Sequence, residues 1–260
     1  MTRIKTITTV GKPYLTSLLS LFLCSLPMQA LGQQVNLTVP EFNRSTNLEA
    51  ASTLQAQQLP DLPKRPRSGR RKPASARGPC SPSEKSITAL IPTTNLGLTT
   101  RAYPTFFFYV PPTPATEMEF VLIDEESQRQ IYTTILKITG NPGIVSLNLP
   151  ATENIPPLEM EKEYHWYASL ICNHQQRSGD IYVDGWIKRV APDSLLMSKL
   201  ENTSLTEQIT LYQEFGLWYD TLKALDEARR RHPEDSALVA KWTTLLKSVG
   251  LEDIAYEPPV

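Results

Sequence analysis

Short runs of alternating hydrophobic and polar residues fill the middle of the chain, over residues 80–190. Alternate side chains of a strand lie on the same face, so these runs predict strands with one buried face. Proline, glycine and asparagine separate the runs, as expected for turns. Seven strands in about 110 residues predict an antiparallel β-sandwich. The runs are SITALIP, TFFFYV, EMEFVLID, RQIYTTILKI, GIVSLNLP, KEYHWYASLIC and DIYVDGWIKRV.

The residues before one of these strands indicate what kind of sandwich forms. Leu158 and Tyr164 are six residues apart, the spacing of a tyrosine corner, in which the hydroxyl group bonds to the preceding backbone. This spacing favours an immunoglobulin-like or fibronectin-like sandwich.

Residues 106–109 are apolar at every position. We therefore expect one face of that strand to meet the sandwich core and helices to cover the other.

The hydrophobic period changes to that of helices after residue 190. Ser204 and Glu207 form a capping box for a helix that runs through Phe215. Two more helices are expected, over residues 217–231 and 236–249, because proline and glycine follow them. Residues 191–260 are thus predicted to form a helical tail.

Part of this tail has the residue spacing of a single tetratricopeptide unit. Thr221 and the pair Gln208-Ile209 depart from that pattern. A lone unit cannot bury its own apolar face, so the tail should pack on the sandwich or on a partner. The residues that match are Tyr212, Gly216, Trp218, Leu225, Ala228 and Pro233.

The first 32 residues have the pattern of a secretory signal peptide. Three cations precede an apolar run over residues 14–28, and Ala30 and Gly32 offer a small-residue cleavage site. The alternative is a membrane anchor, but a run of about 15 residues is short for a span of about 20. We therefore expect an exported protein, periplasmic or extracellular after cleavage.

A basic, proline-rich segment separates this leader from the sandwich. Residues 60–79 carry seven Lys or Arg and one Asp, whereas residues 80–260 carry 15 Lys or Arg and 24 Asp or Glu, a net charge of -9. Residues 33–79 are therefore predicted to be a disordered linker. It would act as a solvated tether or attach to an anionic cell-wall or membrane surface. The acidic body gives no indication of nucleic-acid binding.

Two cysteines, Cys80 and Cys172, remain after the predicted leader. An even number of cysteines in an exported chain favours a disulfide, and the alternative is two buried thiols. Such a bond would close a loop of about 90 residues and stabilise the fold by about 4 kcal/mol.

Residues with catalytic or metal-binding chemistry are few. Alternation places Tyr164 and Trp166 on the core face, and His165 and Tyr167 on the opposite face, directed outward or against a helix. Asp180 and Asp184 share a strand face, but no calcium-loop spacing accompanies them. Histidine pairs with metal-ligand spacing, nucleophile elbows and phosphate loops are absent from the sequence. We predict no catalytic residues, no metal site and no cofactor.

The strand aromatics have two interpretations. They form the core and the seam to another element, or they line a platform on which sugars stack. The residues selected as a candidate binding surface are His165, Tyr167, Trp186 and Trp218.

Several blocks occur together in a distinctive order, among them ITALIPTTNLGLTTRAYPTFFFYVPP, YHWYASLIC, GLWYDTLKAL and LLKSVGLEDI. Residues 80–255 resemble the cyanobacterial "domain of unknown function 928" family of exported proteins. The resemblance implies a secreted, periplasmic protein, and it carries over no catalytic residues.

These observations favour a non-enzymatic exported module that binds an envelope protein through the sandwich and the helical tail. The first alternative is a glycan- or cell-wall-binding module that uses the strand aromatics. A β-sandwich hydrolase with paired carboxylates is the second. The sequence does not predict an oligomeric state.

Overall fold

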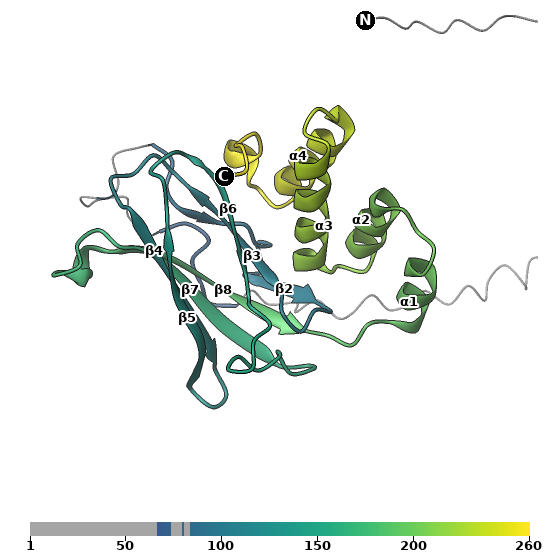
Figure 1. Ribbon diagram of the computed structural model, residues 1–260, viewed down its shortest axis with the longest axis horizontal. Helices are drawn as coiled ribbons and strands as arrows, with labels where there is room; N and C mark the ends of the chain where they lie inside the picture. Colours follow the sequence, from purple (N-terminus) through teal and green to yellow (C-terminus); the bar gives the residue numbers. More distant parts are fainter. Residues whose placement is uncertain (1–66, 74–79, 81–83) are drawn as a thin grey trace, which may run out of the picture. The chain divides into compact units, whose positions relative to one another are not determined.

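A β-sandwich of eight strands followed by four α-helices makes up the described part of the protein, which comprises residues 67–73, 80 and 84–260 of a computed structural model (Figure 1). The expected leader, residues 33–66 and residues 74–79 lie outside the described residues. The strands are β1 (Thr88–Ala89), β2 (Leu96–Thr99), β3 (Thr105–Val110), β4 (Glu117–Asp124), β5 (Arg129–Lys137), β6 (Gly143–Asn148), β7 (Glu163–Leu170) and β8 (Ile181–Arg189).

The strands form a three-stranded sheet in the order β1-β3-β6 and a five-stranded sheet in the order β2-β8-β7-β4-β5. All pairs are antiparallel except β2 with β8, which are parallel. The prediction of a purely antiparallel sandwich is wrong for this pair, and the sequence patterns missed β2. The physical reason is that the chain leaves the smaller sheet after β1 and joins the edge of the larger one, where it runs beside β8.

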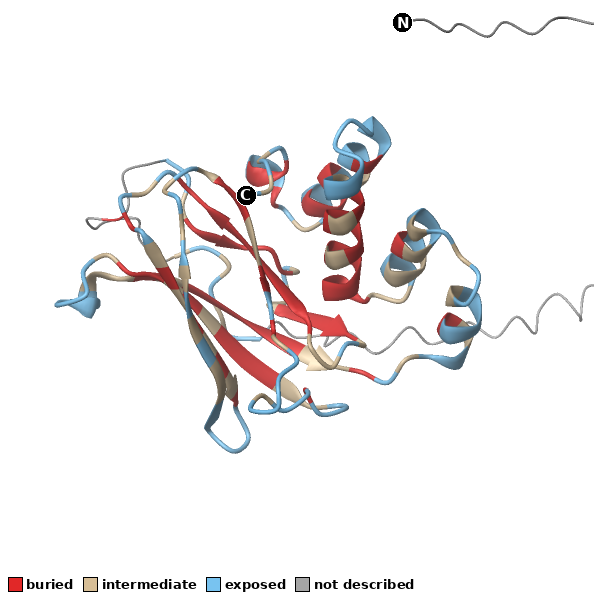
Figure 2. Cartoon of the chain, viewed as in Figure 1, coloured by how far each residue is buried: buried red, intermediate tan, exposed pale blue. Residues whose placement is uncertain are grey.

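Aromatic side chains from both sheets interlock in the core. Phe106 and Phe108 of β3 point toward β4 and β7, and the ring centroids of Phe106 and Phe120 are 4.8 Å apart. Phe108 meets Trp166 edge-on, with 5.4 Å between centroids. All six residues of β3 are buried, whereas β4 and β7 combine buried with half-buried residues (Figure 2). The predicted core face of β7 is confirmed.

The connection before β7 has the hydrogen bond expected from the Leu158–Tyr164 spacing. The hydroxyl group of Tyr164 accepts the backbone N–H of Glu159 at 2.9 Å. Leu158 and Tyr164 are both buried. Burial raises the pKa of Tyr164, so the side chain stays a neutral phenol at ordinary pH.

The last three of the four described helices lie close to the ranges that the sequence predicted. Ser204 and Glu207 form the capping box, and Gly216 after α2 has a φ of 66°, a left-handed conformation that favours glycine. None of the described helices is long and apolar enough to cross a membrane. The helices are α1 (Ser194–Leu200), α2 (Leu205–Glu214), α3 (Trp218–Arg231) and α4 (Ser236–Ser248).

The helices α3 and α4 cover the outer face of the three-stranded sheet (Figure 1). Phe107 of β3 meets Trp242 of α4, with 6.4 Å between ring centroids. The hydroxyl group of Tyr219 on α3 accepts the Trp166 indole N–H at 2.9 Å and donates to the carbonyl of Trp186 at 3.2 Å. The prediction that helices cover the second face of residues 106–109 is confirmed.

Residues 67–72 bind the sandwich, contrary to the expected disorder of the linker. Arg70 exchanges backbone hydrogen bonds with Asp184 of β8, at 3.2 and 3.0 Å. The carbonyl of Arg71 accepts the Ala89 N–H of β1, and its guanidinium donates to the Val249 carbonyl. Together, Arg70 and Arg71 link both sheets to the end of α4. We call residues 67–72 the strap. It is ordered because β8 extends beyond β2 and leaves an unpaired edge there.

Candidate functional site

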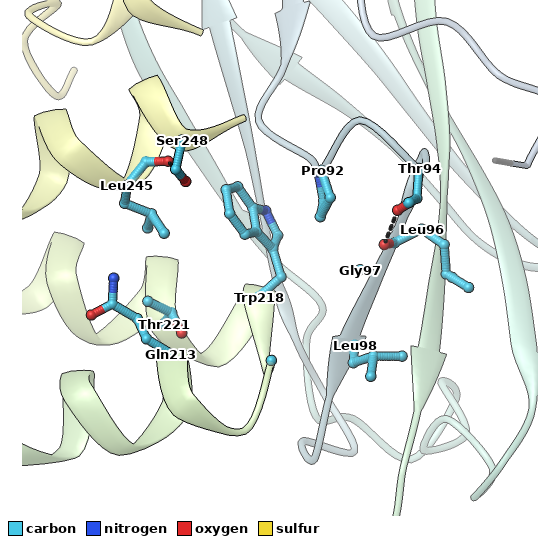
Figure 3. A pocket seen from close by; sticks show the side chains of 11 residues that line it. Pro92, Thr94, Leu96, Gly97, Leu98, Gln213, Trp218, Thr221, Leu245 and Ser248 are labelled. Carbon is cyan, nitrogen blue, oxygen red and sulfur yellow. Dashed lines mark hydrogen bonds between the residues drawn. The ribbon is translucent and has the colours of Figure 1, made fainter. Parts of the chain in front are cut away.

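A partly enclosed cleft of about 350 Å³ lies between β2 and the helices (Figure 3). Its volume is within the range of ligand-binding pockets. No lining residue is ionisable, so the cleft is a neutral and mainly apolar surface. The lining residues are Pro92, Thr94, Leu96, Gly97, Leu98, Gln213, Gly216, Trp218, Thr221, Leu245 and Ser248.

Trp218, which the sequence selected as a candidate binding residue, lies at the centre of this cleft. Its indole N–H donates to the carbonyl of Leu90 at 2.8 Å, which fixes the ring between α3 and the loop before β2. In Figure 3 the ring stands between Leu245 on the helical side and Pro92 on the strand side. Trp218 therefore forms a rigid apolar wall, with 8% of the residue exposed.

The close approach of α3 to β2 depends on a glycine. A Cβ atom at Gly97 would lie 2.5 Å from Cε2 of Tyr219 and 3.3 Å from Cδ1 of Trp218. Any larger residue at position 97 would push α3 away from β2. The absence of a side chain at this position thus sets the width of the cleft.

Asp220 fastens the same helix to the end of β2. Its carboxylate accepts the backbone N–H and the hydroxyl of Thr100, both at 3.1 Å, and it pairs with Arg101 at 3.3 Å. Burial raises the pKa of Asp220, and these hydrogen bonds together with the Arg101 charge oppose that rise. These contacts hold the helical wall of the cleft in register with β2.

A second group of polar residues lies on the outer face of the five-stranded sheet, around His165. Nε2 of His165 is 2.8 Å from Oδ2 of Asp184, and Nδ1 is 3.0 Å from the Tyr167 hydroxyl. The imidazole stacks on Trp186, with 4.2 Å between centroids and 11° between planes. Burial raises the pKa of Tyr167, as do the nearby charges of Asp184 and Glu125. The sequence placed His165 and Tyr167 on this face correctly.

What covers this face differs from the prediction. The expectation that His165 faces outward or meets a helix is wrong, because Asp184, Tyr167 and Trp186 enclose its ring and the strap lies against Asp184 and Trp186. The Trp186 indole N–H donates to the Ser68 carbonyl at 2.8 Å, and the Arg67 guanidinium lies 5.4 Å from the Trp186 ring. His165 and Trp186 are 7% and 9% exposed. Both side chains are therefore engaged within the fold, and neither offers a free binding surface.

The structure separates the four candidate surface residues into two groups. His165, Tyr167 and Trp186 lie together on the outer face of the five-stranded sheet, whereas Trp218 lies in the cleft with residues that the sequence reasoning did not select. Leu96 and Leu98 were missed because LGLT is too short to show a period. Leu245 was missed because an apolar helix position gives no indication of what it faces.

Cys80 and Cys172 form the predicted disulfide, which spans 92 residues. The bond leaves neither sulfur as a free thiol. Asp180 and Asp184 have separate partners: Asp180 accepts the Cys172 N–H, and Asp184 contacts His165. Among the described residues, no cluster of three or more His, Cys, Asp or Glu is arranged to hold a metal ion.

A family described as Domain of Unknown Function (DUF928) matches residues 69–259. The match begins inside the strap and includes the sandwich, the cleft and the helices. No curated protein matches the chain. Because the match covers well over half of its length, this protein belongs to the DUF928 family.

Proposed function

We propose that this protein is an exported, non-enzymatic module that binds a polypeptide partner in the cleft between β2 and the helical tail. The observation that carries the proposal is the neutral, mainly apolar lining around Trp218. Buried aromatic anchors surrounded by apolar residues are typical of protein-binding sites. The Cys80–Cys172 disulfide supports export, because such bonds persist in oxidising compartments.

The two parts that form the cleft are proposed to belong to known fold types. The strand orders β1-β3-β6 and β5-β4-β7-β8, with the bond to the Tyr164 hydroxyl, support an immunoglobulin-like or fibronectin-like sandwich. The pairing of α2 with α3 supports a tetratricopeptide-like unit. Such a unit needs a neighbour to bury its apolar face, and here the sandwich supplies that neighbour.

We do not extend the proposal to glycans. A sugar-stacking platform needs aromatic faces open to solvent, whereas Phe106, Phe107, Phe108 and Tyr109 are at most 2% exposed. Trp166 is in the core at 1% exposure, and Trp186 has His165 against its ring. The carboxylates of the outer face also have partners, so no observation favours the hydrolase alternative.

The interpretation that the basic segment attaches to an anionic surface has less support than the proposal that the cleft binds a polypeptide. Arg67 pairs with Glu163, and Lys72 lies 2.6 Å from Asp253. Arg70 lies over the Tyr182 ring, and Arg71 binds the Val249 carbonyl. Four of the seven cations in residues 60–79 are therefore engaged with the folded part.

The proposal is tested with two arginine variants of α4. Ser248→Arg places a long cation at the edge of the cleft, whereas Thr244→Arg adds the same side chain one turn earlier, outside the cleft lining. Both positions are exposed, so both variants should fold. Affinity capture from envelope extract should retain a partner with wild type and with Thr244→Arg. The amount of partner retained should fall by about tenfold or more with Ser248→Arg.

Two results would contradict the proposal. One is a wild-type protein that retains no partner under conditions in which it is folded. The other is a retained partner that Ser248→Arg and Thr244→Arg affect equally, because binding would then occur outside the cleft.

A further inference from the structure

The backbone of β2 has a free edge that faces away from β8. In a parallel pair, alternate residues direct both backbone groups to the neighbouring strand. The carbonyl of Asn95 accepts the Trp186 N–H at 2.8 Å, and the carbonyl of Thr99 accepts the Val190 N–H at 2.9 Å. Gly97 is in the same register. The backbone groups of Leu96 and Leu98 therefore point to the opposite side.

These outward groups are mostly unpaired. The Thr94 hydroxyl donates to the Leu96 carbonyl at 3.2 Å. Within the described part of the chain, no other hydrogen bond involves the Leu96 N–H or the N–H and carbonyl of Leu98. Leu96 is 1% exposed and Leu98 is 2% exposed. Buried backbone groups without a partner are costly, so a ligand that forms hydrogen bonds with them would gain free energy.

Both leucines line the cleft, so the unpaired edge and the apolar wall around Trp218 belong to one surface. In Figure 3, Leu98 lies on the strand side, and Trp218 and Leu245 lie across from it. An extended polypeptide offers N–H and carbonyl groups at the two-residue repeat that Leu96 and Leu98 present. Its alternate side chains would face the apolar wall. An acyl chain would fill the cleft but leave the backbone groups unsatisfied.

We propose that the occupant of the cleft is an extended, uncharged segment of a partner polypeptide, which adds to β2 as a further strand. The inference rests on the proposed function and specifies its ligand. The segment pairs with the Leu96 and Leu98 backbone and places apolar side chains at alternate positions against Trp218 and Leu245. Proline is excluded at the positions that donate to β2, and charged side chains are excluded from the cleft.

A displayed library of random nine-residue peptides tests this inference without altering the protein. Selection on wild type, with counter-selection on Ser248→Arg, should enrich sequences with apolar residues at every second position. One enriched peptide is then synthesised with a single N-methyl group at each position in turn. Methylation should weaken binding about tenfold at every second position and little at the others, because only alternate N–H groups face β2.

Amide hydrogen exchange gives an independent readout. The peptide should slow exchange at Leu96 and Leu98, and leave Gly97 and Thr99 unchanged because β8 already pairs with them. Enriched peptides without this period, and with unchanged exchange at Leu96 and Leu98, would overturn strand addition and leave the proposed function standing. A library that yields no cleft-dependent peptide would also overturn it. Protection of Leu96 and Leu98 by protein concentration alone, or by a fatty acid, would assign the cleft to a second copy or to a lipid instead.

Discussion

Asp124 shows how one buried carboxylate organises a turn of the sandwich. It ends β4, accepts the Ser127 hydroxyl at 2.6 Å, and lies 2.8 Å from Nζ of Lys162. Burial would raise the pKa of Asp124, but the hydrogen bonds from Lys162 and Ser127 outweigh it and lower that pKa to about 2. Although it lies beside the turn between β4 and β5, Asp124 is only 2% exposed.

This pKa gives a prediction for Asp124→Asn. The folded pKa lies below the ordinary value of 3.8, so the carboxylate stabilises the fold above about pH 4 and loses that contribution as pH falls through about 2. The variant should be about 1–3 kcal/mol less stable than wild type near pH 6, measured by urea unfolding. That difference should shrink between about pH 4 and pH 2.

A matched control is Glu126→Gln in the same turn, because the Glu126 side chain is 85% exposed. This variant should remain within about 0.5 kcal/mol of wild type. A stability difference between wild type and Asp124→Asn that does not change with pH would contradict the assigned role.

At the scale of elements, the seam between β2 and α3 decides the shape of the cleft around Trp218. The N-terminal turn of α3 contributes Trp218 to the cleft and inserts Tyr219 toward the core. Gly97 makes this approach possible, since the space that a Cβ atom would need is already filled by Tyr219.

Gly97→Ala should therefore destabilise the protein by about 1–3 kcal/mol in urea unfolding, as overpacking of a close contact does. Gly179→Ala is the matched control, because a Cβ atom there would meet nothing within 4 Å. It should unfold within about 0.5 kcal/mol of wild type. Equal stability of the two variants would show that α3 does not press on β2 as described.

Over the whole molecule, connections distant in sequence hold the two sheets and the helices together. The disulfide joins Cys80 to the end of β7, and the strap joins β8, β1 and the loop after α4. The disulfide persists in the unfolded chain and reduces its conformational entropy, whereas the strap stabilises the protein through contacts that exist only in the folded state.

Reduction of the disulfide should lower the free energy of unfolding by about 4 kcal/mol, because the bond spans 92 residues. Urea unfolding with and without reductant measures this loss. The double variant Cys80→Ser, Cys172→Ser should match the reduced wild type and give the same midpoint in both conditions. A reductant-sensitive double variant would indicate that another group responds to the reductant.

Local signals in the sequence predicted much of this fold. Period-two runs identified seven strands, and the capping box at Ser204 placed α2 within a residue. The face of His165 followed from alternation, because a strand fixes that relation within a few residues. The strand β2 was not predicted, because four residues, LGLT, are too few to establish a period.

The sequence by itself determined seven of the eight described strands, the helix boundaries and the two-sided burial of residues 106–109, because each depends on neighbouring residues. The cysteine pair followed from the even number of cysteines after the expected leader. Only the tertiary structure decided that residues 67–72 pack against Asp184 and Trp186, and that β2 lies parallel to β8. It alone brought Trp218, Leu96 and Leu98 to one cleft. Those relations depend on contacts between residues about 90 to 120 apart, for which a local pattern carries no information.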